Sequence, residues 1–204
     1  MTSDAKCPVD LAGFQIKSYQ PGRSLLWRAA WFLIGAPVLR CSILPSSRIR
    51  RVLLRSFGAK IGSGVVIKPG VRVKYPWRLS VGDHSWIGED CWIDNLAEVR
   101  IGANACISQG IYICTGNHDW SAAHFDLIVR PIILEDGVWI GARATVTAGV
   151  HIHTCAVATA GSVVNRDIPA FEIRSGNPAQ FVRKREVRQA TDSTTLQASK
   201  RQEV

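Results

Sequence analysis

The sequence predicts an all-β solenoid on three observations: an aliphatic residue every six positions, a glycine that often follows it, and a small residue four places after it. The run begins at Ile61 and ends near Pro169. A helix repeats about every 3.6 residues and an ordinary strand about every 2, so neither produces this spacing. The expected inward positions are Ile61, Ile67, Val73, Val81, Ile87, Ile93, Ile101, Ile107, Ile113, Leu134, Ile140, Val146, Ile152, Ala158 and Val164.

Three hexads plus two extra residues make a unit of 20, marked by Ile61-Gly62, Val81-Gly82 and Ile101-Gly102. We therefore expect coils with three short sides, in which each inward side chain stacks on its equivalent one coil away. Adjacent coils would pair through backbone hydrogen bonds, about 4.8 Å apart. Glycine would relieve the backbone at corners that need a positive φ. The handedness does not follow from this pattern.

The domain organisation has three predicted parts. We expect residues 1–60 to form a basic helical extension. Residues 61–181 should form the β-helix, with an inserted loop at 119–133. Residues 182–204 should form a short basic helix followed by a polar tail that we expect to be disordered. The net charge of +9 is concentrated at the two ends: residues 1–60 hold ten basic and two acidic side chains, while residues 61–182 hold nine and eleven. Basic ends suit an anionic surface, and because no nucleic-acid motif is present, a membrane is favoured over a nucleic acid.

The N-terminal extension contains a helical segment from Ser24 to Leu44. Its longest uncharged run, Ala29 to Leu39, is too short for a bilayer, which needs about 20 residues. Trp27 and Trp31 beside arginines suit a helix in a membrane interface, so we expect peripheral membrane contact through residues 20–57. A cap over the open end of the solenoid is the alternative, and the two can coexist.

The compartment is expected to be the cytoplasm, with a peripheral position at the inner face of the cell membrane. The first ten residues lack the basic start and apolar run of a signal peptide. Six scattered cysteines without a CxxC pair indicate reduced thiols.

His118 is the candidate catalytic residue because it lies where the repeat breaks into a long polar excursion, and such loops usually carry the function of a solenoid. Glu98 precedes His118 by one 20-residue unit, so the repeat predicts that it lies one coil beneath His118. A carboxylate there could hold one imidazole nitrogen and leave the other free as a base. Glu98 can equally be a solvated edge residue.

Several stretches of the chain carry a family resemblance, and the TGNHD segment is the most specific. They are Lys74–Leu79, Trp92–Leu96, Ile107–Gly110, Cys114–Asp119 and Ser175–Ala179. Together they resemble the hexapeptide-repeat acyltransferases, and within them most of all the colanic acid biosynthesis acetyltransferases, which modify sugars of bacterial exopolysaccharides. The resemblance implies a left-handed β-helix, a homotrimer with active sites between subunits, acetyl-CoA as donor and a sugar hydroxyl as acceptor, with no metal. Hence we expect an O-acetyltransferase acting on a sugar nucleotide or a lipid-linked glycan.

The resemblance also implies roles for individual residues. His118 matches the family's general base, and such help contributes about 10²–10⁴ in rate. The matching acetyl-CoA positions are Trp139, Gly141, Ala142, Ala160, Gly161, Asn165, Arg166 and Arg183. Of these, Ala142 would turn its backbone to the thioester, while Arg166 and Arg183 would meet the phosphates or be simple surface charge.

The acceptor side departs from the family. Gly88 falls where well-known relatives place an asparagine one coil before the base. The candidates for acceptor contacts are Asp94, Asn95, Asp119 and Trp120, with Asp126 nearby in the loop. Asp119 can instead cap a turn.

Two other functions remain open. His84, His118 and His124 are spaced suggestively for the zinc site of a γ-type carbonic anhydrase, whose three histidine ligands come from two subunits. The 20-residue register puts His84 and His118 in different columns, although a subunit interface could rejoin them. A non-catalytic β-helix that binds partners is the other alternative.

Overall fold

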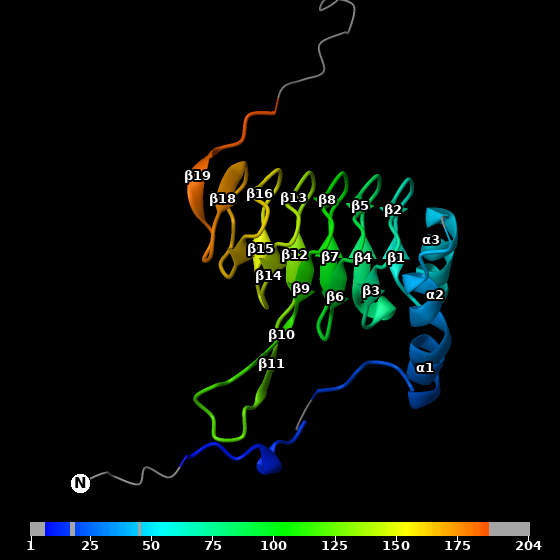
Figure 1. Cartoon of the computed structure of the whole chain (residues 1–204), viewed down its shortest axis with the longest axis vertical. Coiled ribbons are helices and arrows are strands. Elements are labelled where there is room, and N and C mark those ends of the chain that lie inside the picture. The colour runs from blue at the N-terminus through cyan, green and yellow to red at the C-terminus, as the bar shows by residue number, and fades with distance from the viewer. Residues whose placement is uncertain (1–6, 17–18, 45, 188–204) are drawn as a thin grey trace, which may run out of the picture.

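The computed structural model describes residues 7–16, 19–44 and 46–187, and within them the chain is a parallel β-solenoid (Figure 1). Its three sides are sheets, here named A, B and C, whose strands are parallel except for the last strand of sheet B. Sheet A contains β1 (Lys60–Ile61), β4 (Leu79–Val81), β7 (Val99–Ile101), β12 (Ile132–Leu134) and β15 (His151–Ile152). Sheet B contains β2 (Val66–Ile67), β5 (Trp86–Ile87), β8 (Cys106–Ile107), β13 (Trp139–Ile140), β16 (Val157–Ala158), β18 (Glu172–Ser175) and β19 (Gln180–Lys184). Sheet C contains β3 (Arg72–Val73), β6 (Trp92–Asp94), β9 (Tyr112–Cys114), β14 (Thr145–Val146) and β17 (Val163–Val164).

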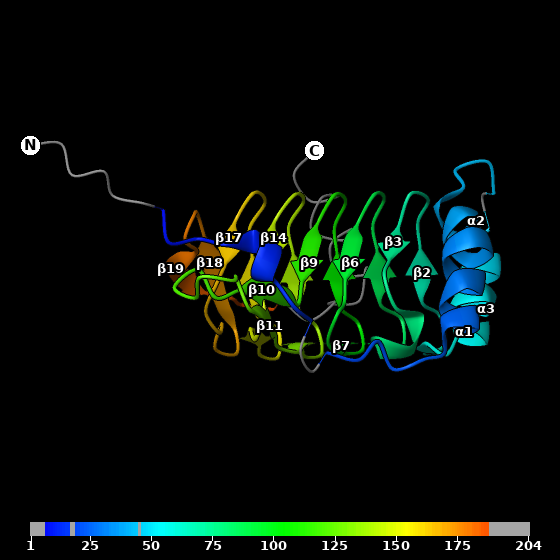
Figure 2. The same cartoon turned by 90° about the horizontal axis from the view of Figure 1, so that it is seen from below.

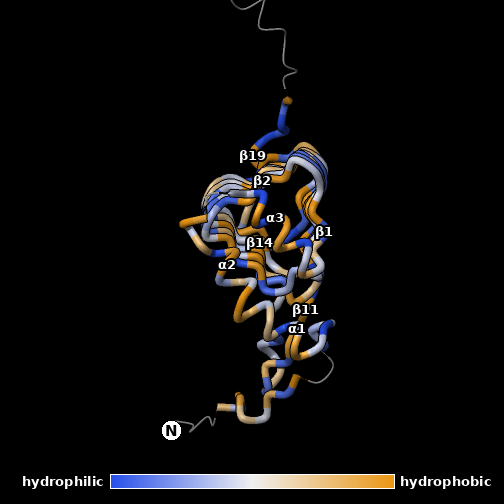
Figure 3. The backbone as a smooth tube through the Cα atoms, turned by 90° about the vertical axis from the view of Figure 1, so that its right-hand side faces the viewer, coloured by the Kyte–Doolittle hydropathy of each residue, from blue (hydrophilic) through white to orange (hydrophobic). Residues whose placement is uncertain are grey.

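The predicted period of six is confirmed by the register. Ile61 pairs with Val81, Val81 with Ile101, and Leu134 with both Ile101 and Ile152. All fifteen expected inward residues are buried, and seen along the axis the coils superpose on one outline (Figure 3). The solenoid is therefore held together by aliphatic stacks that run its whole length.

The glycines that follow the inward residues have a different role from the one expected. Gly82 and Gly141 are not among the residues with positive φ; that conformation occurs two residues further on in the first turn, at His84. A Cβ on Gly82 would lie 2.5 Å from the backbone nitrogen of Ala103, and one on Gly141 would lie 2.4 Å from that of Ala160. The glycines are required because the next coil passes too close for a side chain, so the expectation of positive φ was wrong for them.

The N-terminal helices cover the first coil. They are α1 (Leu25–Ala30), the π-helical turn η2 (Trp31–Gly35), α2 (Ala36–Arg40) and α3 (Ser47–Ser56). Trp31 is fully buried and donates from Nε1 to the carbonyl oxygen of Val73 at 3.1 Å. Arg50 is buried to 1 % exposure and donates to the carbonyl oxygens of Leu39, Cys41 and Leu44. The capping alternative is thus confirmed, and no helix among the described residues is long and apolar enough to cross a membrane.

The chain before the cap runs back along the solenoid (Figure 2). Tyr19 donates to the carbonyl oxygen of Leu96 at 3.1 Å, and Trp77, the middle residue of the short η3 (Pro76–Arg78), donates to that of Pro21 at 2.7 Å. Further upstream, η1 (Leu11–Gly13) lies beside the long excursion from the coils.

The far end of the described chain differs from the prediction. The expected helix over residues 182–189 is wrong in its described part, because residues 182–184 belong to strand β19, which pairs antiparallel with β18. Phe181 and Val182 point to solvent along an edge strand instead of forming a helix face. The predicted disordered tail lies outside the described residues.

Candidate active site

The predicted inserted loop is a hairpin that projects from the corner between sheets C and A. It consists of β10 (Gly116–His118) and β11 (Leu127–Val129), which pair antiparallel with His118 opposite Leu127 (Figure 1). The regular register ends at Cys114, which still pairs with Asp94 one coil below. The backbone N–H of Arg130 then bonds to the carbonyl of Thr115 at 3.0 Å, which closes the base of the hairpin.

The imidazole of His118 is oriented by the backbone of the hairpin. Its Nδ1 lies 2.8 Å from the carbonyl oxygen of Phe125. A carbonyl can only accept, so the neutral ring carries its proton on Nδ1 and leaves Nε2 as an acceptor. The rings of Phe14 and Phe125 lie at centroid distances of 5.8 and 6.3 Å from the imidazole. The arrangement is suited to a general base.

His118 lines an open cavity of about 270 Å³ at the base of the hairpin. The other residues that line it are Asn117, Asp119, Trp120, Ser121, Ile128, Arg130 and Ala148. Trp120 is 79 % exposed, so its indole face is available for stacking. The structure therefore brings together three of the predicted site residues: His118, Asp119 and Trp120.

Asp119 has a local structural role in addition to its place at the cavity. Its Oδ1 accepts a hydrogen bond from the backbone N–H of Ser121 at 3.0 Å, and another from the Ser121 hydroxyl. These bonds hold the pKa of the Asp119 carboxyl below its usual value, and the bond from the Ser121 hydroxyl contributes most. The turn-capping alternative is therefore confirmed, and the side chain is an ionised acceptor at the cavity.

The predicted contact between Glu98 and His118 is wrong. The chain leaves the coil at Gly116, so the 20-residue register does not reach His118. Glu98 is instead paired with Arg100, whose guanidinium nitrogen lies 2.7 Å from Oε2 and lowers the pKa of the carboxyl. Glu98 is the solvated edge residue of the alternative interpretation.

Two predicted acceptor residues lie outside the His118 cavity. Asn95 is fully buried, and its amide accepts from the Tyr75 N–H at 2.9 Å and donates to the Tyr75 carbonyl at 2.7 Å. It braces two coils and has no free group for a ligand, so an acceptor-binding role is wrong for it. Asp94 lines a different cavity, beside the cap, and pairs with Lys74 at 2.9 Å.

Five of the predicted cofactor positions lie together on the edge between sheets B and C. Trp139 is 47 % exposed and donates to the Ser108 hydroxyl at 3.1 Å. Gly141 is packed against the backbone of Ala160, and the N–H of Gly161 bonds to the carbonyl of Ala142 at 2.8 Å. No atom lies within 4 Å of a Cβ built on Gly161, so a ligand could approach the backbone there. This edge is formed by two consecutive coils.

The three remaining cofactor positions lie nearer the far end. Asn165 and Arg166 are exposed and line a small cavity of about 110 Å³ with Arg174 and residues 178–180. Arg183 is exposed on β19, opposite Ile173 of β18. Arg166 thus offers a positive charge at this cavity, whereas the neighbouring Arg174 is paired with Glu172 at 2.9 Å, and Arg183 adds a further charge on the β18–β19 hairpin.

The sequence did not indicate the contribution of residues 7–16 to the site. The N–H of Asp10 bonds to the carbonyl of Ala123 at 2.9 Å, and the Asp10 carbonyl lies 2.9 Å from Nδ1 of His124. Phe14 then reaches the His118 ring. No periodic pattern marks this segment, and only its aromatic residue could have suggested a packing role.

The three histidines of the carbonic anhydrase alternative are not brought together within the chain. His84 lies in a turn between sheets A and B, His118 in β10, and His124 at the tip of the hairpin beside Asp10. Within the described ranges, the group of residues that could hold a metal is a different one, Glu135 with His151 and His153.

Comparisons with known proteins agree with the fold and the motifs. Residues 131–166 match a family model described as the hexapeptide repeat of succinyl-transferase. The chain is 39 % identical over 176 residues to an Escherichia coli K12 protein named "Putative colanic acid biosynthesis acetyltransferase WcaF", which covers 86 % of this chain and 97 % of that one. It is 27 % identical to the galactoside O-acetyltransferase of the same organism over 66 % of this chain and 68 % of that one. A hexapeptide-repeat acetyltransferase from Vibrio cholerae superposes with a TM-score of 0.73 at 25 % identity, over 79 % of this chain and 92 % of that one.

Proposed function

Because the chain belongs to the hexapeptide-repeat acetyltransferase family, we propose that it transfers the acetyl group of acetyl-CoA to a sugar hydroxyl during bacterial exopolysaccharide assembly. The observation that carries the proposal is the oriented imidazole of His118 at an open polar cavity. The name of the Escherichia coli relative supports an exopolysaccharide acceptor.

In the proposed reaction, Nε2 of His118 takes the proton of the acceptor hydroxyl while its oxygen attacks the thioester carbonyl carbon. The tetrahedral intermediate then collapses, the carbon–sulfur bond breaks, and the imidazolium returns the proton to the departing thiolate. A backbone N–H at Ala142 is the proposed donor to the oxyanion. Trp120 would stack on the sugar ring and Asp119 would accept from a second hydroxyl.

The proposed site needs two chains. His118 projects from the corner between sheets C and A, whereas Trp139, Gly141 and Ala160 lie on the edge between sheets B and C. When neighbouring copies pack side by side, the His118 corner of one copy can face the proposed acetyl-CoA edge of the next. This separation supports a cyclic homo-oligomer, and with three-sided coils we propose a homotrimer.

The N-terminal cap supports a membrane-bound acceptor. Its inner face is buried on the first coil, but Leu26 is 83 % exposed, Leu33 77 % and Ile34 62 %. The exposed arginines Arg23 and Arg40 lie on the same segment. Apolar side chains with flanking positive charge suit insertion into the headgroup region of an anionic membrane. We therefore propose peripheral binding at the cytoplasmic membrane face, where a lipid-linked glycan would be presented.

The function is tested by thiol release from acetyl-CoA in the presence of bacterial lipid-linked glycans or sugar nucleotides. Wild-type protein should release thiol only with acceptor, and His118→Ala should lower kcat by about 10²–10⁴. His84→Asn is the matched control, because it removes an exposed histidine from a turn with φ of 58° that asparagine tolerates. Equal activity of the His118→Ala protein and wild type would contradict the proposed base.

A further inference from the structure

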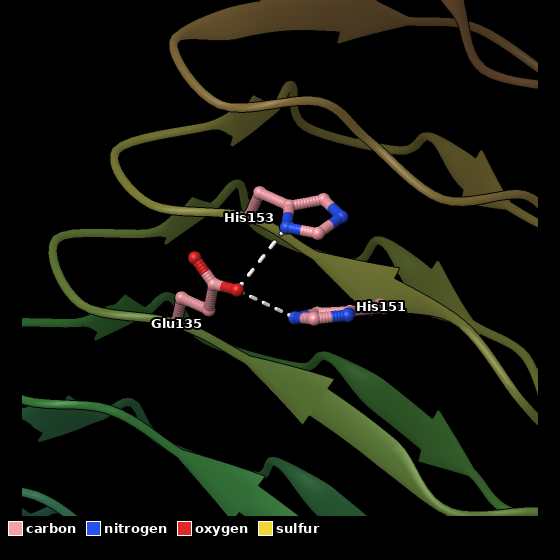
Figure 4. Close-up of side chains that lie close together, drawn as sticks. All are labelled: Glu135, His151 and His153. Carbon is pink, nitrogen blue, oxygen red and sulfur yellow. Dashed lines mark hydrogen bonds and ion pairs between the residues drawn. The ribbon is translucent and has the colours of Figure 1, made fainter.

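A cluster of three ionisable side chains lies on the outside of the solenoid, at the edge between sheets A and B. His151 belongs to β15, His153 follows that strand, and Glu135 follows β12 in the preceding coil. Nε2 of His151 lies 2.7 Å from Oε1 of Glu135, and Nδ1 of His153 lies 3.1 Å from the same oxygen (Figure 4). All three side chains are about one-third exposed, so the cluster is accessible from solvent.

The two imidazoles converge more closely than simple ion pairing explains. Their ring centroids are 3.9 Å apart with planes at 31°, and both aim a nitrogen at one carboxylate oxygen. Without a cation, each nitrogen must carry a proton to donate to that oxygen, and two donors then share a single acceptor atom. One divalent cation can replace both protons, and it turns the three groups into ligands.

The carboxylate is held in the orientation that a ligand needs. The backbone N–H and the hydroxyl of Thr154 donate to Oε2 of Glu135 at 2.7 and 2.6 Å, which leaves Oε1 facing the histidines. These bonds, with the Thr154 hydroxyl contributing most, lower the pKa of the Glu135 carboxyl to about 2. On the other side, Asp167 accepts from the backbone N–H of His151 at 2.8 Å and fixes the strand. Such supporting contacts around a ligand are typical of metal sites.

We propose that Glu135, His151 and His153 form a binding site for a divalent transition-metal ion, with Zn²⁺ as the best-suited occupant. Two imidazoles and a carboxylate are ligands that zinc accepts, and three protein ligands leave a further coordination position for water. The three ligand atoms already lie within 4.8 Å of one another, so side-chain rotations are sufficient to close the site. The family resemblance implied no metal, and the zinc alternative considered from the sequence involved other histidines, His84, His118 and His124.

The proposed ion has a structural role, separate from the transfer of the acetyl group. β12 is the first strand after the hairpin, and β15 follows it in sheet A. An ion held by Glu135 and the two histidines would join these coils on the side of the solenoid away from the His118 corner. Ligand binding to the folded state alone raises its stability, so zinc should raise the melting temperature.

The test is a zinc titration of the full-length, chelator-treated protein by calorimetry, with thermal melts of the same samples. Wild type should bind one Zn²⁺ per chain and melt at a higher temperature with zinc than after chelation. His153→Ala and Glu135→Gln should each weaken binding by more than about 100-fold, and Thr154→Val by about 10–100-fold, since it removes only the supporting hydroxyl. His84→Asn should bind as wild type, and circular dichroism checks that each variant is folded.

Cobalt substitution distinguishes these ligands from the six cysteines. Co²⁺ at the proposed site should give weak visible bands without sulfur-to-metal charge transfer. A strong charge-transfer band that persists in His153→Ala would place the ion on thiolates and overturn the proposal. The absence of zinc binding by wild type, or equal affinity in all variants, would also overturn it. Acetyl transfer is measured separately, because the metal site and the proposed activity can fail independently.

Discussion

The Nδ1 atom of His118 lies 2.8 Å from the carbonyl oxygen of Phe125 across the β10–β11 hairpin. The candidate base is therefore oriented by the main chain and has no carboxylate partner among its described contacts. A backbone carbonyl fixes the tautomer of the ring, as a carboxylate would. This relationship makes the conformation of the hairpin, and not a second titrating side chain, the determinant of the base.

Glu98 should be dispensable for catalysis. Because its carboxylate is paired with Arg100 and partly exposed, Glu98→Gln should change kcat by less than about threefold, a barrier change of under about 0.7 kcal/mol. In the same assay, His118→Ala should lower kcat by a factor of about 10²–10⁴. Steady-state kinetics with the same acceptor would compare the kcat values of the two variants. A fall in the Glu98→Gln variant close to that of His118→Ala would show that the carboxylate acts on the base in the assembled enzyme.

Membrane binding should depend on the exposed apolar residues of the cap. Leu26→Glu combined with Leu33→Glu removes two side chains that are 83 % and 77 % exposed, so the fold should be preserved. Burying a leucine contributes about 1.5–3 kcal/mol, and the double variant should therefore bind anionic vesicles at least about tenfold more weakly. Val182→Glu, at the far end of the molecule, is the control. Vesicle sedimentation in which all three proteins behave alike would exclude this face as the docking surface.

The close approach of coils at Gly82 predicts an unusual sensitivity to one methyl group. Gly82→Ala would place a Cβ 2.5 Å from the backbone nitrogen of Ala103, and neither backbone can move without disturbing a stack. Overpacking of this kind costs about 1–3 kcal/mol in the free energy of unfolding. Asn104→Gly is the control, because Asn104 has a φ of 53° that glycine adopts without strain, and it should change the free energy of unfolding by less than about 1 kcal/mol. Chemical denaturation of the two variants would contradict the explanation if Gly82→Ala were the milder change.

Cys91 should be unreactive in the folded protein. It is buried to 1 % exposure, and burial raises the pKa of its thiol from 9.0 to about 11, because the thiolate is poorly solvated there. The raised pKa contributes stability that is fully present below pH 9 and is lost as the pH rises to about 11. A thiol reagent should label the exposed Cys7 and Cys106 in the folded protein and reach Cys91 only on unfolding. Cys91→Ala should show a smaller loss of stability between pH 9 and 11, and rapid native labelling of Cys91 would contradict the assignment.

The coils could be predicted from the sequence because their pattern is local and repeated. Each inward position, such as Ile113 or Val146, is specified by its own hexad, and the register follows from counting. The same counting failed at Glu98, because the chain leaves the coil at Gly116, two residues before His118, and the count assumes an unbroken path. It also could not distinguish Asn95, which braces Tyr75, from an exposed asparagine that meets a ligand. The site residues it found were those within the recognisable TGNHDW segment.

The remaining part of the site depends on contacts between segments far apart in the chain. Phe14 and His118 are separated by about half of the sequence, and no period links them. Tertiary placement of this kind is decided by packing, which a single sequence does not display. The contact between Glu135 and His153 is different, because the two residues are 18 positions apart, the spacing that pairs Leu134 with Ile152, and counting three hexads places one beneath the other.

The path of residues 7–16 has a consequence for the order of events during synthesis. This arm is translated before the coils, and the part of the hairpin that it contacts, at Ala123, follows Asp10 by more than a hundred residues. The cap at residues 25–56 can seat the first coil early, and the following coils can then be added one by one. The arm must remain unattached until the hairpin exists. Docking of the arm, which brings Phe14 against His118, is therefore expected to complete the candidate active site after the scaffold has formed.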